Sequence, residues 1–390
     1  MSFFLSIAYL SMFVLGLADN IRGPLFPEII ASFQLTGLSS SFFYAATSFA
    51  AFVASYFSYS FLRRRSLTFL LNLSLFLMAM GLFIIGYAQV FSWLLVGAVF
   101  LGLSIGGLGV SQNLMVSENI PLQVRAKALA GLHSIYGMAS LLAPLLAAQA
   151  TLIFSTWRSA FYVNSVICLV LFLVFLFYGT KDKVKNTIQN TIQNTIQNHE
   201  HTAPTTEFSA ALPAPFWGKV TVSGLFAFYV VAEILVSTRL ALYMRENFAM
   251  DLEQSSLYVT YFFIFLFIGR LIFAFFRIPG AIKLQLNLSL VFSLIFLLLG
   301  LRVHPFFLAV VGFTMAPYYP LSVAYISQKT GRNERQYLTL AMSIQSLSVV
   351  CMHLGAGYLT DFGGVKQAFS IGVGALIISM LCLNFHPKKL

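Results

Sequence analysis

Charged and amide side chains lie close together within the first hydrophobic stretch of the chain. Asp19, Asn20 and Arg22 follow an apolar run that begins at Phe3. Inside a bilayer an ionisable side chain costs several kcal/mol unless it faces the protein interior or a watery cavity. We therefore interpret this group as part of a transport pathway, with Asp19 as the first candidate for proton coupling.

A structural role for the same group is the alternative. Asp19 and Arg22 are three residues apart, so on a helix they share one face and partly neutralise each other. Such a pair could serve only to hold helices together. Gly23, Pro24 and Pro27 follow directly and loosen the helix just beyond the charges.

A second carboxylate occurs in the second half of the chain. Glu233 lies within an apolar run, with Tyr229 one turn earlier and Arg239 nearly two turns later. A carboxyl group at this depth is well placed to bind and release a proton, so Glu233 is the second candidate for proton coupling. The alternative is a static ion pair of Glu233 with Arg239 or Arg22.

Polar side chains in other hydrophobic runs are candidates for contact with a solute. Amides and hydroxyls can hydrogen-bond a polar ligand, but they also join neighbouring helices in membranes, and His133 could instead relay protons. The aromatic stretch around Pro317 could stack on a ligand ring or act as a hinge. The candidates are Asn20, Gln112, Asn113, His133, Tyr136, Tyr229, Tyr318 and Gln345.

The composition identifies an integral membrane protein. Of the 390 residues, 59% are hydrophobic and only 9% are charged. At roughly 20 apolar residues per crossing, the chain accommodates about twelve spans. The net charge of +11 comes from basic residues in short loops, so we expect no nucleic-acid partner. The three cysteines lack metal-ligand spacing, and no cofactor is expected.

Twelve apolar runs are bounded by charges and helix breakers. We expect spans at 3–30, 40–62, 67–88, 93–116, 128–152, 160–178, 217–244, 257–276, 284–301, 305–326, 337–358 and 368–385. Residues 179–215 contain a tandem Asn-Thr-Ile-Gln repeat and form a cytoplasmic linker. This divides the chain into an N-terminal six-helix bundle (1–178), the linker and a C-terminal six-helix bundle (216–390).

The distribution of Lys and Arg predicts the orientation. Of 23 basic residues, 16 fall in loops on one side of the membrane, four on the other (Arg158, Arg245, Arg302 and Lys366) and three within spans (Arg22, Arg239 and Arg270). Since basic loops stay in the cytoplasm, both termini are predicted to be cytoplasmic. The expected location is the bacterial inner membrane.

The chain resembles the major facilitator superfamily in its architecture and in a few motifs. The architectural features are twelve spans, cytoplasmic termini and a long central loop, and the basic cluster Arg63–Arg65 matches part of the family's signature after span two. Gly269-Arg270-Leu271 is similar to the corresponding region of the second half. The resemblance implies an all-α membrane protein with two pseudo-symmetric six-helix bundles. From the charges within the spans themselves, we expect Arg22, Arg239 and Arg270 to tune the candidate proton-coupling carboxylates.

Within that family, residues 16–27 are similar to the first span of fucose and hexose proton symporters. This similarity implies a protonatable role for Asp19. No P-loop, G-x-S-x-G, H-E-x-x-H or Cys/His cluster occurs in the sequence, so an enzyme is not expected. We expect a monomeric secondary transporter for proton-coupled uptake of a small polar solute such as a sugar. Proton-driven export of amphipathic drugs or metabolites, and transport of an organic anion by the arginines, are the alternatives.

Overall fold

The computed structural model describes residues 3–62, 64–119, 122–197, 216–275, 279–330 and 334–385, which are almost entirely helical. The first half contains α1 (Phe3–Asn20), α2 (Arg22–Phe33), α3 (Gly37–Leu62), α4 (Leu67–Tyr87), α5 (Phe91–Asn119), α6 (Leu122–Phe154) and α7 (Arg158–Gln197). The second half contains α8 (Phe216–Phe248), α9 (Leu252–Phe275), α10 (Ile282–Arg302), α11 (Phe306–Met315), α12 (Tyr318–Thr330), α13 (Glu334–Gly363), α14 (Val365–Ala368) and α15 (Ser370–Asn384).

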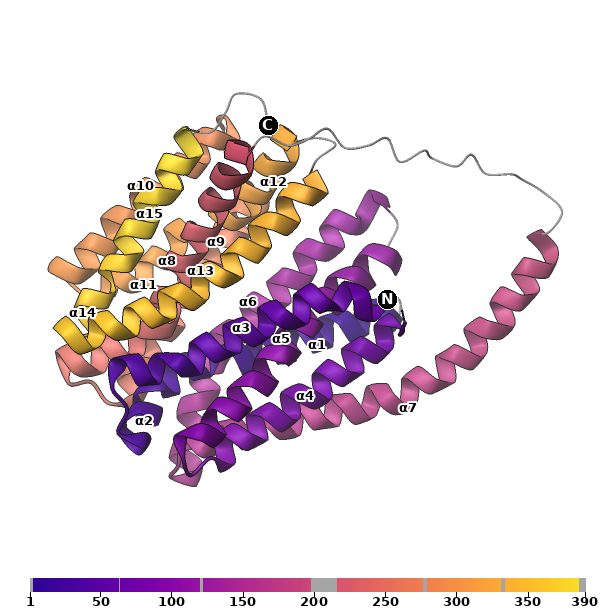
Figure 1. Ribbon diagram of the computed structural model, residues 1–390, viewed down its shortest axis with the longest axis horizontal. Coiled ribbons are helices and arrows are strands. Elements are labelled where there is room, and N and C mark those ends of the chain that lie inside the picture. Colours follow the sequence, from indigo (N-terminus) through magenta and orange to yellow (C-terminus); the bar gives the residue numbers. More distant parts are fainter. Residues whose placement is uncertain are drawn as a thin grey trace.

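Twelve segments in the described part of the chain are long and apolar enough to cross a membrane. This confirms the predicted number of spans. Two bundles of helices lie side by side, and the helices of both run along one common direction (Figure 1). α1 begins and α15 ends at the same end of the molecule, while α2 and α14 lie at the opposite end (Figure 1).

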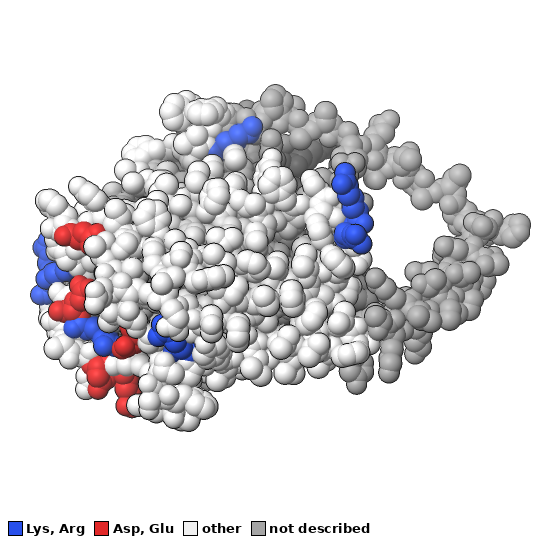
Figure 2. Space-filling model, turned by 60° about the horizontal axis from the view of Figure 1, so that its bottom comes forward, with Lys and Arg blue, Asp and Glu red and all other residues white. Residues whose placement is uncertain are grey.

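The surface is suited to a bilayer. Charged side chains gather at the ends of the molecule and leave a broad uncharged belt between them on the face that Figure 2 shows. Large apolar side chains such as Phe49, Phe83, Val166 and Leu347 are exposed along the spans. In water these surfaces would aggregate, but in lipid they are solvated.

Two spans are divided by helix breaks. The first span is interrupted at Ile21, because Pro24 has no N–H to donate to the Asn20 carbonyl and its ring crowds that oxygen. The break thus lies just after Asp19, one residue before Arg22, and not beyond both as the sequence analysis expected. The tenth span is interrupted at Ala316 and Pro317, between α11 and α12.

The predicted linker begins as helix. α7 continues from the sixth span through the Asn-Thr-Ile-Gln repeats to Gln197. The rest of the predicted linker, 198–215, lies outside the described residues.

Candidate functional site

The N-terminal bundle holds the Asp19 carboxylate between an arginine and a tyrosine. Arg22 forms an ion pair with Oδ1 of Asp19, and the Tyr136 hydroxyl of α6 donates to Oδ2 at 2.7 Å. Asn20 in turn donates to the Tyr136 oxygen at 3.1 Å and to the Ser140 oxygen at 2.9 Å. Both carboxylate oxygens therefore accept hydrogen bonds from donors that suit an ionised aspartate.

The C-terminal bundle holds Glu233 in a comparable group on α8 and α9. The Arg270 guanidinium lies 3.4 Å from Oε1 of Glu233, and the Tyr229 hydroxyl contacts Oε2. The same hydroxyl lies 2.7 Å from the carbonyl oxygen of Met315, at the end of α11. Each bundle thus contributes one carboxylate, one tyrosine and one arginine.

Arg270 also reaches the other bundle. A Cβ atom placed on Gly137 of α6 would lie 3.9 Å from Nη1 of Arg270, an ordinary van der Waals distance, so the guanidinium lies beside α6. Gly137 follows Tyr136, the hydroxyl partner of Asp19. His133 lies one turn earlier on α6 and is exposed. The groups around the two carboxylates therefore meet where α6 and α9 pack together.

One end of the interface between the bundles is closed by polar contacts. Glu28 of α2 and Arg245 of α8 form an ion pair across it. The Asp361 carboxylate of α13 accepts hydrogen bonds from the backbone N–H groups of Gly37 and Leu38, the latter at 2.7 Å. These contacts lie at the end opposite to the termini, which we call the closed end.

Two arginines lie buried between the carboxylates and the closed end. Arg239 of α8 is fully buried, donates to the Ser41 hydroxyl at 2.6 Å and places its Cζ 4.5 Å from the centroid of the Phe26 ring. Arg22 lies over the ring of Tyr44, with 5.1 Å between Cζ and centroid. Tyr44 in turn stacks on His353 of α13 at 4.8 Å, joining the two bundles.

Side-chain exposure shows which end gives access to the carboxylates. Asp19 and Glu233 keep 26% and 19% of their side-chain surface exposed. Arg239, Tyr44 and His353, on the way to the closed end, are buried. The two carboxylates are therefore partly accessible, whereas the groups between them and the closed end are not.

The sequence profile of the Major Facilitator Superfamily matches residues 8–335 of the chain. The chain belongs to this superfamily. Its members are transporters, and this transporter is not an enzyme. The resemblance stated from the sequence and the fold it implied are both confirmed.

Solved structures of low sequence identity share the fold of this transporter. A bacterial homologue of the human lysosomal transporter Spinster, in an inward-facing and occupied conformation, has a TM-score of 0.70 at 13% identity, covering 97% of this chain and 95% of that one. A D-xylose-proton symporter has 0.71 at 12%, covering 99% of each chain. The peptide transporter POT in complex with sulfate has 0.71 at 13%, covering 98% and 95%.

The structure brings together only some of the candidate residues. Asp19, Asn20, Arg22 and Tyr136 form one group, and Tyr229, Glu233 and Arg270 form the other. Asn113 donates to the Gly109 carbonyl of its own helix. Gln112 is fully buried, and its amide has no hydrogen-bond partner within the described structure. Gln345 is half-buried on α13.

Two expectations about side-chain partners differ from the structure. Glu233 pairs with Arg270 and not with Arg239 or Arg22, because Arg239 is six residues away, about 240° around the helix. The hydroxyl of Tyr318 points into the C-terminal bundle, 3.1 Å from the Leu225 carbonyl and 2.9 Å from Ser379. It therefore has its hydrogen-bond partners within that bundle.

Several residues of the site were missed by the sequence analysis. Ser41, Tyr44, Ser140 and His353 are single polar residues in apolar helices, and nothing in their local sequence distinguishes them from packing residues. Only the approach of α3 to α13 and of α1 to α6 gives them their partners.

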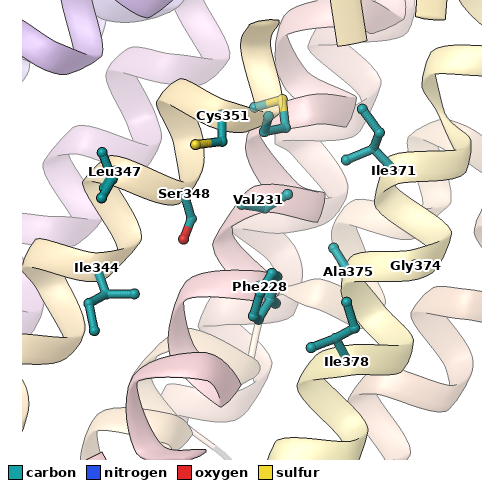
Figure 3. Close-up of a pocket in the computed structure, with 11 residues that line it drawn as sticks. Phe228, Val231, Ile344, Leu347, Ser348, Cys351, Ile371, Gly374, Ala375 and Ile378 are labelled. Carbon is teal, nitrogen blue, oxygen red and sulfur yellow. The ribbon is translucent and has the colours of Figure 1, made fainter. Parts of the chain in front are cut away.

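A cavity of about 560 Å³ lies apart from these groups. Apolar residues of α8, α13 and α15 line it, among them Phe228, Leu347, Ile371 and Ile378, and Figure 3 shows their side chains around it. Ser348 is its one hydroxyl-bearing member, and Cys351 and Met352 contribute sulfur atoms. It contains none of the candidate residues, so a polar solute has little to bind there.

Proposed function

We propose that this transporter couples the movement of a small polar solute to protons by alternating access. The observation that supports the proposal is the pair of partly exposed carboxylates, Asp19 and Glu233, one in each bundle. Each has a tyrosine hydroxyl and a guanidinium as partners. A carboxylate with hydrogen-bond partners and access to water can exchange a proton as its surroundings change.

The solute would lie between the bundles, beside these groups. Asn20, His133 and Tyr136 supply hydrogen-bonding groups near the contact of α6 with α9. Such groups suit hydroxyl-rich compounds such as sugars. The similarity of residues 16–27 to sugar-proton symporters and the fold shared with a D-xylose-proton symporter agree with uptake of a sugar.

Proton exchange on solute binding tests this function. Purified protein in weakly buffered detergent solution receives sugars, amino acids, organic acids or cationic drugs while the pH is recorded. We expect one class of compound to change the pH. Asp19→Asn and Glu233→Gln should each reduce that change by about half or more, because each removes one exchangeable site.

Glu28→Gln provides the matched control, because it removes a carboxylate that is ion-paired at the closed end, away from the two groups. It should leave the size of the pH change as in wild type, because a partly exposed ion pair contributes little. The proposal fails if a compound that stabilises the protein against heat causes no pH change. It also fails if both site variants behave like Glu28→Gln.

A second candidate function is transport of an organic anion. It is favoured by the two buried arginines, since Nη1 of Arg22 and both Nε and Nη1 of Arg239 have no hydrogen-bond partner within the described residues. A carboxylate or phosphate would satisfy these donors. If carboxylates protect the protein against thermal unfolding, and Arg239→Met abolishes that protection, this candidate replaces the sugar.

A further inference from the structure

A single hydroxyl group connects Glu233 to the break in the tenth span. Tyr229 is fully buried, and its ring stacks on Tyr318 with 4.2 Å between centroids. Its hydroxyl contacts Oε2 of Glu233 and lies 2.7 Å from the Met315 carbonyl oxygen. A phenol has one proton to donate, and a carbonyl oxygen can only accept.

Counting donors shows what both contacts require. If the Tyr229 proton goes to the Met315 carbonyl, Glu233 must itself carry a proton and donate it to the tyrosine oxygen. If Glu233 is ionised, Tyr229 donates to the carboxylate, and the Met315 carbonyl loses this donor. Both hydrogen bonds exist together only when Glu233 is protonated.

The Met315 carbonyl lies at the end of α11, beside the helix break, and accepts a hydrogen bond from the Tyr229 side chain. Pro317 and Pro320 have no N–H group, so the carbonyls of Phe313 and Ala316 lose their regular helical donors, and the helix is interrupted between α11 and α12. Ser289 of α10 donates to the neighbouring Thr314 carbonyl at 2.6 Å. The Tyr229 hydroxyl likewise donates to the Met315 carbonyl. Loss of either donor would change the stability of this break.

The surroundings of Glu233 differ from those of Asp19. Asp19 accepts hydrogen bonds from Arg22 and Tyr136. Within the described residues, the Tyr136 hydroxyl has no backbone carbonyl as a second acceptor for its proton. The groups that face Glu233 are Tyr229 on its own helix, Arg270 of α9 at 3.4 Å and the Tyr319 hydroxyl of α12. Of these two carboxylates, Glu233 is the one whose tyrosine donor also contacts a backbone carbonyl.

We propose that Tyr229 transmits the protonation state of Glu233 to the α11–α12 break. With Glu233 protonated, a chain runs from the carboxyl through the Tyr229 hydroxyl to the Met315 carbonyl. When the Glu233 proton leaves to water, the tyrosine hydroxyl turns to the carboxylate and releases the carbonyl. No covalent bond other than that to the exchanging proton changes. This proposal rests on the proposed function, because it takes Glu233 as an exchanging site.

Infrared spectroscopy of the full-length protein in lipid vesicles tests the proposal without a solute. Methionine carrying ¹³C at its carbonyl carbon labels the carbonyls of all 12 methionines, that of Met315 among them, and difference spectra are recorded while the pH is changed. A band of protonated carboxyl that is absent from Glu233→Gln reports Glu233. We expect a labelled carbonyl component to shift with the same pH midpoint as that band, because a lost donor changes the carbonyl stretch.

Three variants decide the outcome. In Tyr229→Phe the methionine component should no longer respond to pH. Tyr318→Phe removes an equally buried hydroxyl whose partners are Leu225 and Ser379, so it should behave like wild type. In Glu233→Gln the amide can donate permanently to Tyr229, which should hold the carbonyl component at its low-pH position.

Different failures have different meanings. The inference is overturned if the Glu233 band titrates while the methionine component stays fixed, or if that component still shifts in Tyr229→Phe. It is also overturned if Glu233 gives no protonated band at any pH. The proposed function survives that last result if Asp19→Asn still reduces solute-linked proton exchange, and fails separately if no such exchange occurs.

Discussion

At the level of single residues, Arg239 is a fully buried charged group with few compensating contacts. Its guanidinium is fully buried, has one hydrogen bond to Ser41 and lies against the Phe26 ring. It forms no ion pair within the described part of the chain. A buried charge without a counter-ion costs several kcal/mol, of which a desolvated cation–π contact returns about 2 kcal/mol. This arginine therefore opposes the conformation in which the closed end is shut.

We predict that Arg239→Met raises the apparent unfolding temperature and slows transport. Methionine fills the space of the aliphatic part of the arginine and removes the uncompensated charge, which should favour the closed end by about 1 kcal/mol or more. Thermal unfolding in detergent measures the change. Arg245→Met, which removes a partly exposed ion pair with Glu28, should not raise the temperature. A lower unfolding temperature for Arg239→Met would mean that the guanidinium stabilises this conformation.

The hydroxyl of Tyr136 permits a second prediction at this level. Tyr136→Phe removes a donor to the Asp19 carboxylate. Since a hydrogen bond to a charged group contributes about 1.5–3 kcal/mol, proton-coupled transport should fall by about tenfold or more. Tyr9→Phe is the control, because it removes another bond between α1 and α6, from the Tyr9 hydroxyl to the Ala128 carbonyl at 2.9 Å. Equal losses in both variants would indicate a structural role for Tyr136.

At the level of helices, the closed end depends on a close crossing of α3 and α13. A Cβ atom on Gly357 would lie 2.2 Å from the Ser41 hydroxyl oxygen and 2.4 Å from the Gly37 carbonyl oxygen. No side chain fits at these distances unless the helices separate. The crossing joins the two bundles, so it exists only while this end is shut.

Gly357→Ala should therefore open the closed end. We expect a longer distance between spin labels placed on α3 and α13 at that end, measured by pulsed electron resonance. Gly355→Ala is the matched control on the same helix, since its Cβ would meet only Ile371, at 3.4 Å. It should leave the distance unchanged. An unchanged distance in Gly357→Ala would show that the crossing does not hold the bundles together.

At the level of the whole molecule, orientation decides which compartment the carboxylates face. The basic loops predict that the termini, and with them the accessible end of Asp19 and Glu233, face the cytoplasm. The closed end would then face outwards. This conformation would admit protons and solute from the inside.

Cysteine labelling tests the orientation. In a variant without native cysteines, Gln89→Cys between α4 and α5 should react with a membrane-impermeant maleimide added to intact cells. Arg65→Cys, in the basic loop between α3 and α4, should react only after permeabilisation. Both positions are exposed in the structure, so access differs only by side. The reverse pattern would show that the termini lie outside.

Local spacing in the sequence was sufficient for the number of spans and for side-chain pairs about one turn apart, but not for the position of the break at Ile21 or for the extension of α7 into the predicted linker. The apolar runs determine the twelve spans, and helical periodicity places Asp19 beside Arg22 and Tyr229 beside Glu233. Proline positions account for the breaks near Ile21 and Pro317. These features arise from neighbours within about four residues, and hydrophobicity and helix geometry predict them.

Only the tertiary structure decided which helices supply the remaining partners. Tyr136 reaches Asp19 across 117 positions of sequence, and Arg270 reaches Glu233 across 37. Gln112 looked equally suited to a solute, yet it faces inward and is buried. The physical reason is that helices in lipid associate through shape, small residues and a few hydrogen bonds, and none of these features names the partner helix in the sequence.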